Sequence, residues 1–135
     1  MKIIVCIDER GGMAFNKRRQ SSDVRVTEDI LRTAAGRLTV YPYSEKLFSA
    51  IGGDTVQVSD TALDDGGDGY VFVEDRDVKG YISSADGLII YSWNRHYPAD
   101  LRLGFKPGEE GMRLTWRTEF VGNSHERITK EIYER

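Results

Sequence analysis

The sequence predicts a single α/β domain covering residues 1–135, in which helices flank a mixed β-sheet that ends in an antiparallel C-terminal hairpin. Short apolar runs rich in β-branched residues alternate with segments of helical periodicity. The length of 135 residues suits one domain, and the chain has no repeat, low-complexity tract or proline-rich linker. Two alternating runs, 112–120 and 127–134, flank a short turn-like segment, which is the pattern of a hairpin.

The first βα unit is expected within residues 1–36. Residues 3–7 form a continuous apolar run, which is typical of a strand buried on both faces of a sheet. From Ser22 onward, apolar residues recur at three- and four-residue steps as far as Ala34 or Ala35, which predicts one helical face. Gly36 is the expected C-terminal stop of this helix, because glycine readily adopts the left-handed conformation found there.

A second βα unit should follow directly. Residues 37–41 alternate apolar and polar positions, and Pro42 closes this strand because it cannot donate a ladder hydrogen bond. Ser44 is then expected to cap a short helix that ends at Gly52-Gly53.

Four further β segments are expected. Residues 55–58 and 69–74 are short β runs joined by an acidic, glycine-rich turn, and they are expected to pair as a hairpin. Residues 87–91 form a fully apolar strand, and residues 100–105 form a weaker alternating one.

Composition excludes several classes of protein. The chain is 39% hydrophobic and 30% charged, which is typical of a globular domain, and no apolar run is long enough to span a membrane. No export signal is visible at the N-terminus, so a cytoplasmic location is expected. A net charge of −3 makes nucleic acid an improbable partner. Cys6 is expected to be a buried small hydrophobe rather than a nucleophile.

The most distinctive polar segment is residues 16–23. Lys17, Arg18 and Arg19 are adjacent cations, and they lead into the start of the first predicted helix. Arginine forks and free amides at a helix start both bind phosphate, so this segment is a candidate site for a nucleotide or an RNA backbone. A solvated basic loop is the alternative, and no phosphate-loop motif occurs in the chain.

A second candidate segment follows the strand at 87–91, where aromatic and basic residues interleave. Ligands of open α/β sheets gather outside the carboxyl ends of the parallel strands, and this segment should share that edge with the basic loop and with the start of the second helix. Trp93 can stack on a ring, or it can simply cover the sheet edge. The expected ligand-binding patch contains Arg18, Arg19, Ser44, Trp93, Asn94 and Arg95.

The order of elements resembles that of the dihydrofolate reductases over the whole chain. The strand at 4–8 followed by Gly12-Met13 is similar to the first strand and mobile loop of that family, and Tyr97 stands where the family has a tyrosine. The resemblance implies an NADPH cofactor whose phosphates contact Ser44. It also implies that Asp23 is the carboxylate that holds a pterin-like substrate. A helix N-terminal aspartate stabilised by the dipole is the alternative for Asp23.

The chain departs from that family at the cofactor site. The family has a glycine pair where this sequence has Ser92 and Trp93, and a side chain there occupies volume that a dinucleotide needs. We therefore expect a small-molecule or nucleotide-binding protein on a remodelled scaffold rather than an active dihydrofolate reductase. The alternatives are an NADPH-dependent reductase and a non-catalytic interaction domain. The candidate partners are a small molecule or nucleotide and a second copy of the chain in a homo-oligomer.

The chain also resembles short bacterial proteins that carry the label ribonuclease Z. That activity requires a His-x-His-x-Asp-His cluster that holds two metal ions. The only two histidines are His96 and His125, and no such cluster is present, so no metal site is expected.

Overall fold

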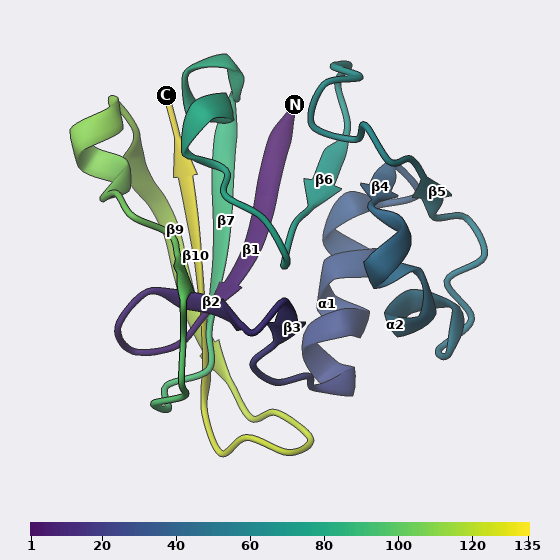
Figure 1. The fold of residues 1–135 in the computed structure, drawn as a ribbon, viewed down its shortest axis with the longest axis vertical. Helices are drawn as coiled ribbons and strands as arrows, with labels where there is room; N and C mark the ends of the chain where they lie inside the picture. Colours follow the sequence, from purple (N-terminus) through teal and green to yellow (C-terminus); the bar gives the residue numbers. More distant parts are fainter.

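The structure is a computed structural model that describes residues 1–135. It is built around a seven-stranded mixed sheet with the strand order β5-β4-β6-β1-β7-β10-β9 (Figure 1). Strands β5, β4, β6, β1 and β7 are parallel to one another, and β10 pairs antiparallel with both β7 and β9. The strands are β1 (Lys2–Ile7), β4 (Leu38–Val40), β5 (Gln57–Val58), β6 (Tyr70–Phe72), β7 (Gly87–Ser92), β9 (Arg113–Phe120) and β10 (Ile128–Glu134).

The remaining elements lie around this sheet. A smaller three-stranded sheet has the order β3-β2-β8. Its strands are β2 (Gly12–Phe15), β3 (Arg18–Arg19) and β8 (Leu101–Arg102). The helices are α1 (Val24–Ala34) and α2 (Glu45–Ser49), with short 3₁₀ segments η1 (Pro42–Ser44), η2 (Lys79–Ser84) and η3 (Pro107–Glu110). No helix has both the length and the apolar character needed to cross a membrane.

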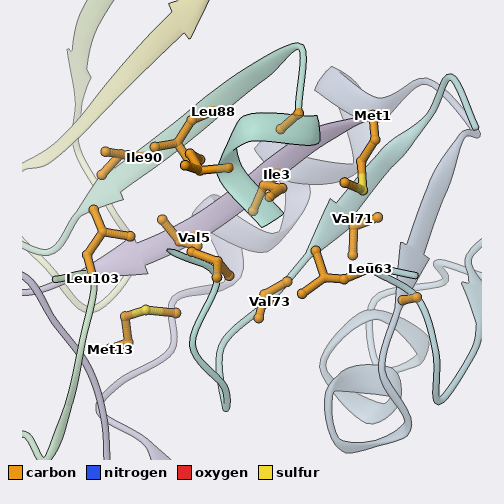
Figure 2. Packing of buried hydrophobic residues seen from close by; sticks show 14 of the residues in the cluster. Met1, Ile3, Val5, Met13, Leu63, Val71, Val73, Leu88, Ile90 and Leu103 are labelled. Carbon is orange, nitrogen blue, oxygen red and sulfur yellow. The ribbon is translucent and has the colours of Figure 1, made fainter. Parts of the chain in front are cut away.

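Both faces of the central strands β1 and β7 are buried, which explains their continuous apolar runs. Along β1, Ile3 and Val5 pack into one hydrophobic cluster, whereas Ile4 and Cys6 pack into the other. The first cluster lies under η2 and the small sheet, with Met13 and Leu103 close to Val5 and Ile90 (Figure 2). The second cluster lies under α1 and α2 (Figure 1). Alternation of side chains along each strand therefore supplies two separate cores.

Helix α1 is where the sequence predicted it, with different ends. It begins at Val24, and Asp23 is the N-cap, whose side chain accepts a hydrogen bond from the Arg25 amide at 3.0 Å. The helix stops at Ala34, and Ala35 adopts a left-handed φ of 49° before Gly36 does the same at 82°. The left-handed stop thus begins one residue earlier than expected.

The structure confirms the C-terminal hairpin, in which β9 and β10 pair from Ile128↔Phe120 to Glu134↔Arg113. The hairpin expected from residues 55–58 and 69–74 is wrong. β5 and β6 lie on opposite sides of β4, and each pairs parallel with it. β6 lies between β4 and β1 and is parallel to both. In this central position Val71 packs into the first core and Phe72 into the second.

The segment 100–105 also differs from expectation. Only Leu101–Arg102 forms a strand, and it pairs with β2 in the small sheet instead of joining the large one. The hairpin of β2 and β3 was not anticipated from the sequence. Its two-residue loop, Asn16-Lys17, has φ angles of 53° and 63°, so both residues are left-handed, as in a type I′ turn.

Candidate functional site

The carboxyl ends of β1, β6 and β7 meet β3 and the beginning of α1 (Figure 1), and a narrow crevice lies between them. Its interior volume is about 10 Å³, roughly the space of one water molecule. Its walls are half apolar and half polar. They include Cys6, Met13, Arg19, Gln20, Ser21, Asp23, Val26, Ile30, Phe72, Glu74 and Trp93.

One side of the crevice is closed by a salt bridge between the small sheet and β6. The Arg19 guanidinium donates to both oxygens of Glu74, with Nε–Oε1 at 2.9 Å and Nη2–Oε2 at 2.8 Å. Ser44 is the N-cap residue of α2, as expected, but its side chain makes no capping hydrogen bond; its buried hydroxyl instead donates to Glu74 Oε2 at 2.7 Å. The hydrogen bond to Glu74 raises the pKa of Arg19, so this guanidinium remains charged. Arg19 and Ser44 therefore meet through an acidic residue that the sequence did not single out.

Trp93 fills the opposite side. Its side chain is only 4% exposed and belongs to the core beneath α1. The indole stacks on the His125 ring, with centroids 4.7 Å apart and planes 25° from parallel. The ring therefore occupies crevice volume and also holds the imidazole in a fixed plane.

Asp23 lies deep at the junction of α1 and the loop that joins β9 to β10. Its carboxylate accepts hydrogen bonds from the amides of Arg25, Asn123 and Ser124, at 3.0, 2.9 and 2.8 Å. The Ser124 hydroxyl and the Nδ1 atom of His125 complete its partners, at 3.2 and 3.0 Å. A Cβ at Gly122 would stand 2.5 Å from this carboxylate, so only glycine lets the loop approach so closely.

The environment of Asp23 favours the ionised form. Burial by itself raises the pKa of Asp23, but the hydrogen bonds from Asn123, His125 and Ser124 outweigh it and lower the pKa well below its usual range. Asp23 is therefore a carboxylate at neutral pH, with both oxygens engaged by the protein itself.

His125 connects this carboxylate to two hydroxyl groups. Its ring is 3% exposed, and its Nε2 atom lies 3.0 Å from Ser21 Oγ and 3.0 Å from the Tyr97 hydroxyl. Those two oxygens are 3.4 Å apart. Sequence reasoning missed Ser21 and His125, because they are 104 positions apart and no local motif links them.

Asp8 is a second buried carboxylate that the sequence did not single out. It accepts hydrogen bonds from the amides of Arg10, Gly12 and Tyr97, and from the Gln20 side chain. Burial alone raises the pKa of Asp8, but these hydrogen bonds reverse the effect and lower it. Asp8 thereby fixes the backbone at Tyr97, whose hydroxyl reaches His125.

The structure does not gather all the expected ligand residues in one patch. Asn94 lies outside the crevice, where its amide donates to the Arg127 carbonyl and the Thr129 hydroxyl. Arg95 is exposed and donates to the Ser124 carbonyl at 3.2 Å. Arg18 borders a separate hollow of about 260 Å³ together with Phe15, Asn16, Arg19, Gln20, Tyr97 and Pro98.

A second open hollow, of about 330 Å³, lies between α1 and α2 beside Ser22, Asp23 and Lys46. The two hollows adjoin the crevice on either side, since Arg19 borders all three spaces. No group of three or more His, Cys, Asp or Glu side chains is placed to hold a metal ion. The ribonuclease Z label therefore has no support in the structure.

Comparison with known proteins identifies the fold. No protein-family model matches the sequence, and no curated protein matches it. A similar solved structure is "Dihydrofolate reductase from Enterococcus faecalis complexed with NADP(H)and RAB-propyl", with a TM-score of 0.69 and 13% sequence identity. The match covers 99% of this chain and 95% of that one. This protein therefore has the dihydrofolate reductase fold.

Proposed function

We propose that the protein binds a small phosphate-bearing molecule, of nucleotide size or smaller, in the hollow beside Arg18. The observation that carries this proposal is the state of that guanidinium. Arg18 is exposed, its guanidinium makes no ion pair or hydrogen bond within the chain, and it borders a hollow of about 260 Å³. An unpaired arginine fork in a concave site is suited to a phosphate group.

The neighbours of Arg18 support the same ligand class. Arg18 and Phe15 are cross-strand partners in the β2–β3 hairpin, and Phe15 is 50% exposed. Its ring can stack on a base while the guanidinium binds the phosphate.

The test is a melting experiment with AMP, GMP, CMP and inorganic phosphate. We expect at least one nucleotide to raise the melting temperature, because a ligand that binds only the folded state stabilises it. Arg18→Glu should weaken binding by about 10- to 100-fold, as expected for the loss of a charge-assisted hydrogen bond. Lys17→Glu is the matched control, because it makes the same change of charge next to the hollow without lining it. No shift with any of these probes would contradict the proposal.

The alternative is an NADPH-dependent reductase, which the fold supports. In that case Asp23 would bind the substrate, and Ser44 would bind a phosphate group of the cofactor. Three observations argue against it: both Asp23 oxygens are engaged, Ser44 donates to Glu74, and the Trp93 indole lines the crevice. These residues do not fit a dinucleotide or a pterin without rearrangement. Millimolar NADPH in the same melting experiment distinguishes the two, since a shift that persists in Arg18→Glu would favour the reductase.

A further inference from the structure

We propose that Ser21, His125 and Asp23 form a nucleophilic triad that hydrolyses small carboxylic esters. The three side chains are hydrogen-bonded in the order that this chemistry requires. Ser21 Oγ lies 3.0 Å from His125 Nε2, and Asp23 Oδ2 lies 3.0 Å from Nδ1 on the other side of the same ring. A nucleophile, a base and a carboxylate that orients the base are the three parts of this chemistry, and they are recognised by geometry rather than by sequence position.

The state of Asp23 fixes the tautomer of the histidine. An ionised carboxylate only accepts hydrogen bonds, so the bond at 3.0 Å requires the proton to lie on Nδ1. Nε2 then carries the lone pair, and the Ser21 hydroxyl is placed to donate to it. The stacked Trp93 indole holds the ring in this orientation. The buried negative charge of Asp23 also stabilises the imidazolium that forms when His125 accepts a proton.

Two donors are available for the oxyanion. The Tyr97 hydroxyl lies 3.4 Å from Ser21 Oγ, to which it can donate while Ser21 donates to Nε2, and it is free to donate to the oxyanion once Ser21 Oγ has attacked the substrate. The Ser22 amide, next to the nucleophile and one residue before the N-cap of α1, makes no hydrogen bond within the chain. An amide and a tyrosine hydroxyl are both used to stabilise tetrahedral intermediates, and the positive end of the α1 dipole favours negative charge there.

Of the three side chains, only that of Ser21 is accessible to a substrate. Ser21 is half-buried and borders the crevice, whereas His125 and Asp23 are 3% and 4% exposed. The crevice has room for about one water molecule, so even a short acyl group such as acetyl enters only when the side chains that line it move apart. The alcohol portion would then extend toward one of the two open hollows, which are bordered by Gln20 and Ser22, the neighbours of Ser21 in the chain.

The reaction proceeds in two balanced stages. In the first, Ser21 Oγ forms a bond to the ester carbonyl carbon, its proton moves to His125 Nε2, and the carbonyl electron pair moves onto oxygen. The intermediate then breaks the bond to the alkoxy oxygen, which takes the proton from Nε2 and leaves as an alcohol. In the second stage, water repeats these steps on the acyl-serine, giving a carboxylic acid and free Ser21.

The test is covalent labelling with a fluorophosphonate, followed by intact mass measurement and peptide mapping. We expect one adduct, on Ser21, in the wild type. The adduct should be absent in Ser21→Ala and unchanged in Ser22→Ala, because the Ser22 hydroxyl takes part in none of these hydrogen bonds. Asp23→Asn should slow labelling by about 10³- to 10⁴-fold, provided that its near-UV circular dichroism remains native.

Either of two results would overturn the proposal: no adduct on the wild type, or an adduct that survives in Ser21→Ala. Release of p-nitrophenol from p-nitrophenyl acetate, with transient acetylation of Ser21, is the second expected readout. The inference does not depend on the phosphate ligand, since Arg18→Glu should lose nucleotide binding and keep fluorophosphonate labelling.

Discussion

At the scale of single residues, the most consequential group is the Asp23 carboxylate, which joins the beginning of α1 to the β9–β10 loop. A helix N-terminal role could be read from the sequence, and Asp23 is indeed the N-cap of α1. Its partners Asn123, Ser124 and His125 lie about one hundred positions away, beyond the reach of any local pattern. The same carboxylate therefore supports both the loop and the orientation of the histidine.

We predict that Asp23 makes the fold sensitive to acid. The pKa of Asp23 is lower in the folded state than in the unfolded chain. Its contribution to the free energy of unfolding is therefore complete above the ordinary pKa of 3.8, and it is lost as the pH falls toward the lower pKa of the folded state. Asp23→Asn should cost about 3 kcal/mol at neutral pH and flatten the acid limb of the stability curve. Urea unfolding at a series of pH values measures this. The exposed Asp54, which makes no hydrogen bond, provides the control Asp54→Asn. Equal acid limbs in the wild type and Asp23→Asn would contradict the prediction.

The sequence identified part of the site. Arg19 and Trp93 line the crevice, and Ser44 reaches it through Glu74, because ligands and loops gather at the carboxyl ends of parallel strands. Asn94 and Arg95 follow the same strand but turn toward the β9–β10 loop. The left-handed backbone at Asn94, with φ of 58°, redirects the chain there, and nothing in the apolar pattern of the strand indicates that turn.

At the scale of elements, burial decided what could be predicted. β1 and β7 were evident because both of their faces are apolar. The β2–β3 hairpin was missed because its turn is Asn16-Lys17 rather than the usual Asn-Gly. Asparagine tolerates a positive φ, but lysine does not do so readily. The hairpin that places Arg18 is therefore held against a local preference at Lys17.

That conflict gives a prediction about stability. Lys17→Gly should raise the free energy of unfolding by about 0.5–1 kcal/mol, because glycine adopts the left-handed conformation without steric cost. Lys106→Gly is the matched control, since Lys106 has a φ of −105° and gains nothing from glycine. Chemical denaturation of the two variants measures the difference. A Lys17→Gly protein no more stable than Lys106→Gly would contradict the left-handed turn.

At the scale of the whole molecule, the order of strands and helices was enough to predict the fold. The strand order within the sheet was not, because the two-residue β5 carries no pattern that fixes its partner. The cytoplasmic location expected from the sequence stays a prediction. The large sheet also ends in an open strand, β9 (Figure 1). Trp116 and Leu114 on this strand are exposed. Open edges with exposed apolar residues favour pairing between chains.

We predict that two copies associate through β9. An antiparallel pairing centred on Trp116 would bury both indoles and set Arg113 of each copy opposite Glu119 of the other. Light scattering should show a mass that rises toward a dimer with concentration in the wild type, and a monomer in Trp116→Glu. Phe15→Glu, which places the same charge at another exposed aromatic, should associate like the wild type. A wild-type monomer at every concentration would contradict the prediction.

Cys6, the only cysteine of the chain, lines the crevice, and its reactivity can be used to detect opening of the crevice. Cys6 borders the crevice and is otherwise buried, and burial together with the charge of Glu74 raises its pKa well above the ordinary value. While the Arg19–Glu74 salt bridge is formed, the Cys6 thiol is both buried and protonated. We therefore expect alkylating reagents to react with it only when this bridge opens. The rate of Cys6 alkylation in the unmodified protein therefore measures how often the crevice opens to molecules from solvent.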